Sequence, residues 1–381
     1  MTETWTAAYR SAPVSPYEPT PLVHPSRGFG DQTLRQVVRV RGGGDRLRVR
    51  LSNLYGKEPL ALARIRCALH ATGSAIVPGT DTPVTFGGSP EIRIDAGQEA
   101  VSDAVDLPTT AETDLVISTY YATPCEPATY HPFALQTGYL AAGDVTSHLG
   151  TARPEQVEPR FHLTGVDVRT PPGRRVVAAF GDSLTDGVGT TPGAHLRYTD
   201  QLARRVASAG LSLINLGIAG NRLLTDVFGE SGTARFDRDV LAAPGVTHLI
   251  VQLGLNDICL PSTQGARPPS VDELVDGYTA LAERARQHGL TTVVATITPF
   301  GGAEAISPGF DNPENEELRR RVIRWIRTSG EFDAVADLDR ALRDPAAPTA
   351  LAPAHDSGDH IHPNDAGALA MAAAIADALP D

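Results

Sequence analysis

Ser183 is the residue of this sequence best placed to act as a nucleophile. It follows residues 176–180, a run of apolar and small residues without alternation, which is typical of a strand buried on both faces. Gly181 permits a tight turn after this strand, and Asp186 and Gly187 favour turns and helix caps. The hydroxyl is therefore predicted to lie at the carboxyl end of a parallel strand, where open α/β sheets bind their ligands.

Such a serine needs a base within hydrogen-bonding reach to take its proton. His362 is the best candidate because Asp359 stands three residues before it. On a turn that leads into a helix, this spacing lets the carboxylate accept from Nδ1 of the imidazole and leaves Nε2 facing Ser183. At the same offset, His360 has a serine and His355 has an alanine.

Acyl transfer also builds negative charge on the carbonyl oxygen, which requires hydrogen-bond donors fixed in advance. Two more apolar stretches end in segments that could supply them, residues 215–221 and 253–257. We expect the donors to be the backbone N–H groups of Ser183 and Gly220 and the side-chain amide of Asn256. A glycine lets substrate approach the backbone closely, and an asparagine donates without ionising.

Four segments, taken in order, resemble the sequence blocks of the SGNH hydrolases, also called the GDSL lipase/esterase family. They are residues 176–187, 215–221, 253–257 and 359–363, and the resemblance covers about residues 172–381. Each block is weak alone, whereas the combination is specific. The resemblance assigns the same roles: Ser183 as nucleophile, Gly220 and Asn256 as oxyanion donors, His362 as base and Asp359 as its partner. Family members hydrolyse or transfer many kinds of acyl group, so the resemblance indicates a mechanism better than a substrate.

Strands and helices alternate after residue 170. The expected strands are 176–180, 211–216, 247–253, 291–298 and 334–338, and the expected helices are 195–209, 270–288, 315–328 and 363–379. Ser270 and Glu273 match a capping box, and Pro363 suits a first helical position. Residues 171–381 are thus predicted to form a three-layer α/β/α sandwich with a parallel five-stranded sheet, the SGNH or flavodoxin-like arrangement.

Residues 1–170 have a different pattern. Residues 1–30 are rich in proline and polar residues, including Pro21, and are expected to form an extended arm. Residues 37–41 and 47–51, joined by a glycine-rich segment, predict a β-hairpin. Further short strands are expected at 61–69, 83–86, 91–94, 100–107 and 113–121. Many short strands without helical periodicity predict an all-β sandwich of jelly-roll type as a separate domain.

The composition limits the classes of partner. A net charge of −12 argues against nucleic acid and anionic membranes, which require a basic surface. Arg46, Arg48 and Arg50 alternate with apolar residues, so we expect them to face solvent rather than to form a stripe for an anionic ligand. Cys67, Cys125 and Cys259 match no metal motif and are expected to be isolated thiols rather than a disulfide and a spare.

No secretory signal is recognisable in the N-terminal residues, and no stretch has the length of a membrane span. The expected location is therefore cytoplasmic, or secreted if a leader has been removed. We expect an esterase that acts on a small-molecule or glycan-linked acyl ester, without a cofactor or a metal ion. The sequence leaves the oligomeric state open.

Three alternatives stay open. The acyl group could pass from Ser183 to an alcohol instead of water, which would make the protein an acyltransferase. The residues His355, Asp356, Asp359, His360 and His362 could hold a divalent metal ion. The β domain could bind a glycan beside an inactive α/β domain.

Overall fold

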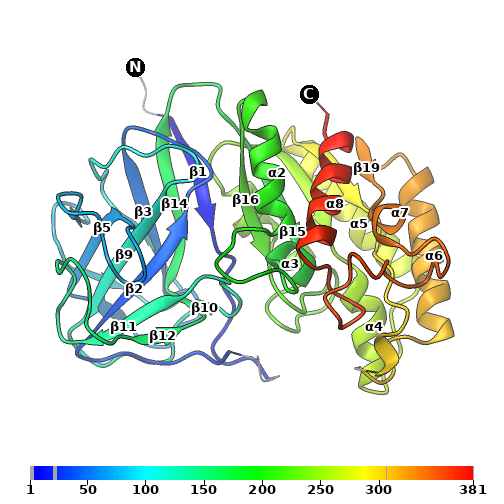
Figure 1. Cartoon of the computed structure of the whole chain (residues 1–381), viewed down its shortest axis with the longest axis horizontal. Coiled ribbons are helices and arrows are strands. Elements are labelled where there is room, and N and C mark those ends of the chain that lie inside the picture. Colours follow the sequence, from blue (N-terminus) through cyan, green and yellow to red (C-terminus); the bar gives the residue numbers. More distant parts are fainter. Residues whose placement is uncertain (1–3, 20–23, 306, 381) are drawn as a thin grey trace. The chain divides into compact units, whose positions relative to one another are not determined.

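The structure is a computed structural model that describes residues 4–19, 24–305 and 307–380. The chain divides into two compact units, Met1–Arg174 and Arg175–Asp381 (Figure 1). Each unit is described by itself. In the colour scheme of Figure 1, the first unit runs from blue to green and the second from green to red.

The second unit contains the predicted parallel five-stranded sheet, with strand order β16-β15-β17-β18-β19. All neighbouring strands in it run parallel. The strands are β15 (Arg175–Gly181), β16 (Leu211–Gly217), β17 (Val246–Gln252), β18 (Thr291–Ala295) and β19 (Ala334–Ala336). Because β15 lies inside the sheet, the turn that follows it is flanked by the ends of β16 and β17.

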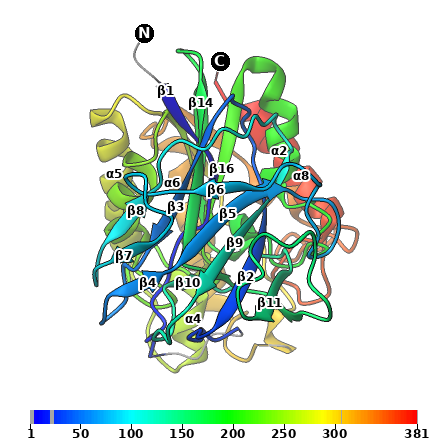
Figure 2. The ribbon, with the colours of Figure 1, turned by 90° about the vertical axis from the view of Figure 1, so that its left-hand side faces the viewer.

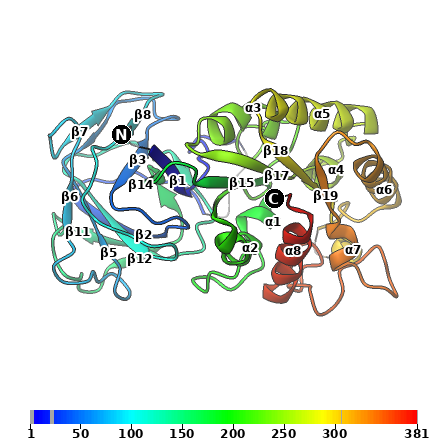
Figure 3. The same ribbon diagram turned by 90° about the horizontal axis from the view of Figure 1, so that it is seen from above.

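Helices cover both faces of this sheet, as the alternating pattern predicts. Figure 3 shows α3 and α5 on one side and α2 and α8 on the other. The helices are α1 (Ser183–Asp186), α2 (Tyr198–Val206), α3 (Gly232–Phe236), α4 (Leu255–Thr263), α5 (Val271–Gln287), α6 (Pro313–Thr328), α7 (Leu338–Leu342) and α8 (Asp365–Ala378). Within the described ranges, no helix combines the length and apolar character that crossing a bilayer demands.

Two helix starts test the predicted capping signals. The capping box at Ser270 and Glu273 is confirmed, since the Ser270 Oγ accepts from the Glu273 N–H at 3.2 Å and the Glu273 carboxylate accepts from the Ser270 N–H at 2.7 Å. The prediction that Pro363 is the first helical residue of α8 is wrong. Asn364 is the N-cap, because its side-chain oxygen accepts from two backbone N–H groups, those of Ala366 and Gly367.

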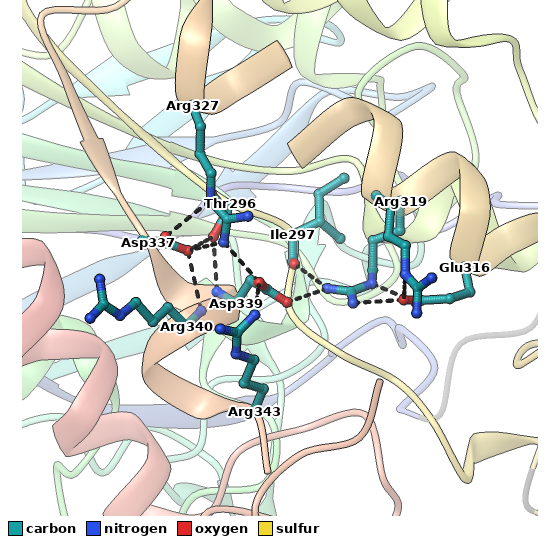
Figure 4. A network of polar contacts seen from close by, with 10 residues as sticks. Thr296, Ile297, Glu316, Arg319, Arg327, Asp337, Asp339, Arg340 and Arg343 are labelled. Atoms are coloured by element: carbon teal, nitrogen blue, oxygen red, sulfur yellow. Dashed lines mark hydrogen bonds and ion pairs between the residues drawn. The ribbon is translucent and has the colours of Figure 1, made fainter. Parts of the chain in front are cut away.

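A polar network joins the ends of β18 and β19 to α6 (Figure 4). The buried Arg319 donates to the Ile297 carbonyl at 3.1 Å and to the Asp339 carboxylate at 2.7 Å. Asp339 also accepts from Arg327 at 2.8 Å, and its backbone N–H donates to Thr296 Oγ1 at 2.8 Å. These bonds hold β19, the edge strand of the sheet, which precedes Asp359 and His362 in the sequence.

The first unit is an all-β sandwich built from antiparallel strands. One sheet has the order β1-β14-β3-β8 and the other β12-β11-β2-β9-β5-β6; Figure 2 shows β2, β5 and β9 side by side. The strands of the first sheet are β1 (Thr4–Arg10), β14 (Leu163–Thr170), β3 (Leu47–Ser52) and β8 (Glu99–Val101). Those of the second are β12 (Glu155–Val157), β11 (Gly138–Ala142), β2 (Gln32–Arg39), β9 (Asp114–Tyr121), β5 (Arg64–Leu69) and β6 (Thr82–Val84). Short pairs join β10 (Tyr130–His131) to β13 (Arg160–Phe161) and β4 (Leu60–Leu62) to β7 (Ile92–Ile94).

The predicted hairpin of residues 37–41 and 47–51 is wrong. Its two strands belong to different sheets, because β2 pairs with β9 and β11 whereas β3 pairs with β14 and β8. The glycine-rich connection crosses from one sheet to the other instead of turning back. A Cβ atom on Gly44 would lie 2.3 Å from the carbonyl oxygen of Arg169, so the glycine serves a close backbone approach.

The extended arm expected over residues 1–30 is in part a strand. Residues Thr4–Arg10 form β1, whose backbone groups pair with β14 at the edge of the first sheet. Pro21 lies outside the described residues.

Arg48 and Arg50 do not simply face solvent. Both contact Asp167, a fully buried carboxylate of β14, at 3.1 and 2.9 Å, and Arg10 contacts the same carboxylate at 2.5 Å. Burial disfavours ionisation of Asp167, but the charges of Arg10 and Arg50 outweigh this effect and lower its pKa. Arg46 pairs with the exposed Asp106 at 2.5 Å. The positive charges of Arg46, Arg48 and Arg50 thus pair with carboxylates of the same unit.

The three cysteines are free thiols, as predicted. Cys67 and Cys259 are buried and Cys125 is partly buried. Burial raises the pKa of all three thiols, which keeps them protonated and unreactive.

Candidate active site

Ser183 is the first residue of α1, immediately beyond β15. Asp182 is the N-cap, and its Oδ1 accepts from the Leu184 N–H at 3.0 Å. A Cβ atom on Gly181 would lie 2.0 Å from Thr185 Oγ1, so the turn closes only with glycine at this position. The strand and the cap therefore fix where the Ser183 side chain begins.

His362 lies against Ser183, and Asp359 lies against His362. The Nε2 atom of the imidazole is 2.8 Å from Ser183 Oγ, and its Nδ1 atom is 2.6 Å from Asp359 Oδ2. The other oxygen of Asp359 accepts from the backbone N–H groups of Ile361 at 2.9 Å and His362 at 2.8 Å. The structure thus brings together three residues that the sequence singled out.

The electrostatics of this group favour an ionised Asp359. Partial burial disfavours the charge, but the hydrogen bond from His362, its charge and the backbone donors outweigh burial and hold the pKa of Asp359 well below its usual range. An ionised Asp359 can only accept hydrogen bonds, so Nδ1 of His362 carries the ring proton and donates to it, and Nε2 is left to accept from the Ser183 hydroxyl.

The neighbouring acidic and histidine residues form a second, separate pair. His360 Nδ1 lies 2.6 Å from Asp356 Oδ2, while Asp359 is engaged by His362. Among the described residues, no group of three or more potential metal-binding side chains is arranged to hold an ion. The geometry therefore gives no support to the alternative of a metal site.

The loop after β16 is tied to α1 at the position of Gly220. The Ala219 N–H donates to Asp186 Oδ2 at 3.1 Å. Gly220 has a φ angle of +79°, and a Cβ atom there would lie 2.8 Å from the Phe228 ring. Glycine is therefore required both by the backbone and by the packing.

Asn256 occupies the second position of α4 and is buried. Its Nδ2 donates to the Asn221 carbonyl at 3.1 Å, which fixes the side chain beside the residue that follows Gly220. In the part of the chain that the structure describes, the N–H groups of Ser183 and Gly220 donate to no protein acceptor. These two amides, and the second hydrogen of the Asn256 amide, remain for another oxygen.

Arg235 of α3 is a buried residue of this region that the sequence analysis missed. Its guanidinium donates at 2.9 Å to the carbonyls of Gly181, the last residue of β15, and Leu216, the penultimate residue of the neighbouring β16. It also donates to Asn221 Oδ1 at 3.0 Å and Asp239 Oδ2 at 3.0 Å. The only local signal in the sequence is the spacing of four between Arg235 and Asp239, which is common on helices.

Asp182 and Asp257, two of the buried aspartates of the region, bind local amides. Asp257 accepts from the N–H groups of Leu223 at 2.7 Å and Leu224 at 3.0 Å, which holds the loop after Gly220. Burial raises the pKa of Asp257 to about 6 and that of Asp182 to about 7. Among the described residues, Oδ2 of Asp182 is buried without a hydrogen-bond partner.

We expect Arg235→Gln to lower the free energy of unfolding by about 3 to 5 kcal/mol, because strand-end carbonyls and Asp239 lose a buried charged donor. Trp5 and Trp325 are the two tryptophans of the chain, so urea unfolding in a Trp5→Phe background reports through Trp325 on the second unit. Arg286→Gln is the control, since Arg286 is 61% exposed and should change stability by less than about 1 kcal/mol. Equal effects of the two variants would contradict the role of Arg235.

Asp182→Asn should change the pH dependence of stability. An unfolded aspartate titrates near pH 4, so between about pH 4 and 7 the native protein retains a proton on Asp182 that the unfolded chain has released. This contribution makes the native state less stable as pH rises through that interval. Relative to wild type, the variant should therefore gain about 2 kcal/mol in the free energy of unfolding between pH 5 and pH 7.5. A difference that does not vary with pH would show that Asp182 ionises normally.

Several solved structures are similar to about half of this chain. The aryl esterase of M. smegmatis is 18% identical, with a TM-score of 0.42 over 53% of this chain and 97% of that one. A lipase/acylhydrolase from Enterococcus faecalis is 19% identical, with a TM-score of 0.41 over 53% of this chain and 94% of that one. A GDSL-like lipase from Bacteroides thetaiotaomicron is 16% identical, with a TM-score of 0.40 over 54% of this chain and 88% of that one. No curated protein matches the sequence. The model of the GDSL-like lipase/acylhydrolase family matches residues 179–370, half of the chain, and this protein therefore belongs to that family.

Proposed function

We propose that this protein hydrolyses carboxylic esters through an acyl-enzyme on Ser183. The observation that carries the proposal is the continuous line of hydrogen bonds from Asp359 through His362 to the Ser183 hydroxyl, at 2.6 and 2.8 Å. Family membership supports an acylhydrolase, and the line of bonds supplies the nucleophile, the base and the group that orients the base.

In the first half of the reaction, Ser183 Oγ attacks the carbonyl carbon while Nε2 of His362 takes the hydroxyl proton. The carbonyl electrons move to oxygen and give a tetrahedral intermediate. Asp359 stabilises the imidazolium that forms. The bond to the alcohol oxygen then breaks, and His362 returns its proton to that oxygen, which leaves the acyl group on Ser183.

The negative oxygen of the intermediate would be bound by the N–H groups of Ser183 and Gly220 and by the Asn256 amide. These donors are fixed before substrate binds, by the α1 cap, by the packing of Gly220 and by the bond from Asn256 to Asn221. Donors that need no reorientation stabilise the intermediate more than mobile ones.

In the second half, water loses a proton to His362 and attacks the acyl group, which releases the acid and restores the Ser183 hydroxyl. An alcohol in place of water would give a new ester by the same steps. Product analysis with and without an added alcohol therefore separates hydrolysis from acyl transfer.

We expect Ser183→Ala and His362→Ala to reduce kcat for 4-nitrophenyl acetate by about 10⁶-fold, and Asp359→Asn by about 10⁴-fold. Asp359→Asn is less damaging because the nucleophile and the base remain. Thermal unfolding serves as the folding control. A His362→Ala variant with a normal rate would rule out this base, and an enzyme inactivated by a chelator but not by a serine-directed phosphonate would rule out the nucleophile.

Asn256→Ala should reduce kcat by about 100- to 1000-fold while KM changes little, because the lost donor acts on the intermediate more than on the bound ester. The measurement is steady-state hydrolysis of 4-nitrophenyl acetate. Since the variant also loses the bond to Asn221, its unfolding temperature must be measured in parallel. An unchanged kcat in a folded variant would contradict the assignment.

A further inference from the structure

Arg222, in the loop after Gly220, is a buried arginine with two guanidinium nitrogens that have no acceptor among the described residues. The residue is 6% exposed, and its Nε and Nη2 atoms are buried and make no hydrogen bond among the described residues. Buried charged donors without acceptors are costly, because they give up the hydrogen bonds that water would provide. A side chain in this state gains free energy if an acceptor reaches it.

The unpartnered edge of Arg222 is the one that binds carboxylates elsewhere in this chain. In Arg39, Nε and Nη2 donate to the two oxygens of Asp114 at 2.7 and 2.6 Å. This two-donor edge matches the spacing of two oxygens in a carboxylate or a phosphate. The chemistry of the free edge therefore favours an anion with paired oxygens.

The nearby carboxylates do not fill this role. Asp257 turns one oxygen to the Leu223 N–H and the other to the Leu224 N–H, and among the described residues it forms no ion pair with Arg222. Burial lowers the pKa of Arg222, and the charge of Asp257 opposes that shift. At neutral pH the guanidinium stays charged.

Arg222 lines a pocket of about 390 Å³ within the second unit. The pocket wall also includes Asp257, Pro261, Arg267 and Glu273. The Glu273 carboxylate is engaged by the N–H and hydroxyl groups of Ser270, at 2.7 and 2.8 Å. Arg267 is exposed and adds a second positive charge at the wall.

Arg222 is close to the proposed oxyanion donors along the chain, although none of those donors lines the pocket itself. Arg222 is two residues beyond Gly220, so their Cα atoms lie within about 8 Å of each other. Between them, the Asn221 carbonyl accepts from Asn256, and Asp257 follows Asn256 directly. An ester that reaches both Arg222 and Ser183 must span this backbone distance and the length of the Arg222 side chain.

We propose that Arg222 binds an anionic group, a carboxylate or a phosphate, carried by the ester substrate. This inference rests on the proposed function and narrows its substrates to esters with a negative charge. When such a group enters the pocket, the Arg222 side chain rotates and turns its Nε and Nη2 edge toward the group. Two donors that had no acceptor among the described residues then donate to a charged acceptor.

Two matched ester pairs test the proposal. The first pair is 4-nitrophenyl hydrogen adipate and 4-nitrophenyl hexanoate, of which only the adipate has a terminal carboxylate on its acyl group. The second pair is 4-acetoxybenzoate and 4-methylphenyl acetate, of which only the benzoate has a carboxylate on its alcohol group. The wild-type protein should favour the charged member of at least one pair in kcat/KM. Arg222→Gln should lower that charged-to-neutral ratio by about 10- to 100-fold.

Two further variants control this measurement. Arg222→Lys keeps the charge without the two-donor edge and should retain only part of the ratio. Arg324→Gln removes an exposed arginine of α6 and should leave the ratio unchanged. An equal ratio in wild type and Arg222→Gln overturns the anion site, while turnover of the neutral esters would leave the proposed function standing.

Calorimetric titration separates the two proposals if no ester is turned over. Ser183→Ala should bind adipate, and the double variant with Arg222→Gln should bind it at least about 10-fold more weakly. Such binding without turnover supports the anion site and contradicts the hydrolase. Inorganic phosphate could instead change the rate of hexanoate ester hydrolysis in wild type but not in Arg222→Gln, while neither charged ester is favoured. In that case the site binds a free anion, and the proposal that the substrate carries the anionic group is overturned.

Discussion

The site depends on one interaction, the hydrogen bonding of the fully buried Arg235 guanidinium to acceptors inside the protein. Arg235 donates to carbonyls at the ends of β15 and β16, to the Asn221 side chain and to Asp239. Strand ends are free to fray when only the sheet holds them, whereas here a charged donor joins two of them. Ser183 begins two residues beyond one of these carbonyls, so its position follows from the same bonds.

The proximity of Asp359 to His362 is the part of the site geometry that the sequence predicts best, because its signal is local. A spacing of three between Asp359 and His362 already implies a shared turn, and the structure has the two side chains 2.6 Å apart. The parallel sheet is also predictable from the sequence, since strands buried on both faces form uninterrupted apolar runs. The contacts that join these segments could not be predicted from the sequence. Except for Asp239, the acceptors of Arg235 are 14 to 54 residues away from it along the chain.

The first unit was harder to predict for the same physical reason, because the contacts that stabilise it join residues far apart in the sequence. Strand β14 contains Gly165 and the charged Asp167, which argue against a central strand unless the three arginines that contact the carboxylate are known. The false hairpin has a similar origin. A glycine-rich connection favours a tight turn and a close crossing of backbones equally, and only the packing of Gly44 against Arg169 separates the two.

The turn that holds Asp359 and His362 has a consequence for how the protein would lose activity. Its internal bonds, from the carboxylate to Nδ1 and to two backbone amides, involve no residue of the sheet. The orientation of the imidazole is therefore set within this turn, and the contact from Nε2 to Ser183 Oγ joins the turn to the nucleophile. Loss of the bonds within the turn would displace the imidazole from Ser183 without breaking a bond of the sheet.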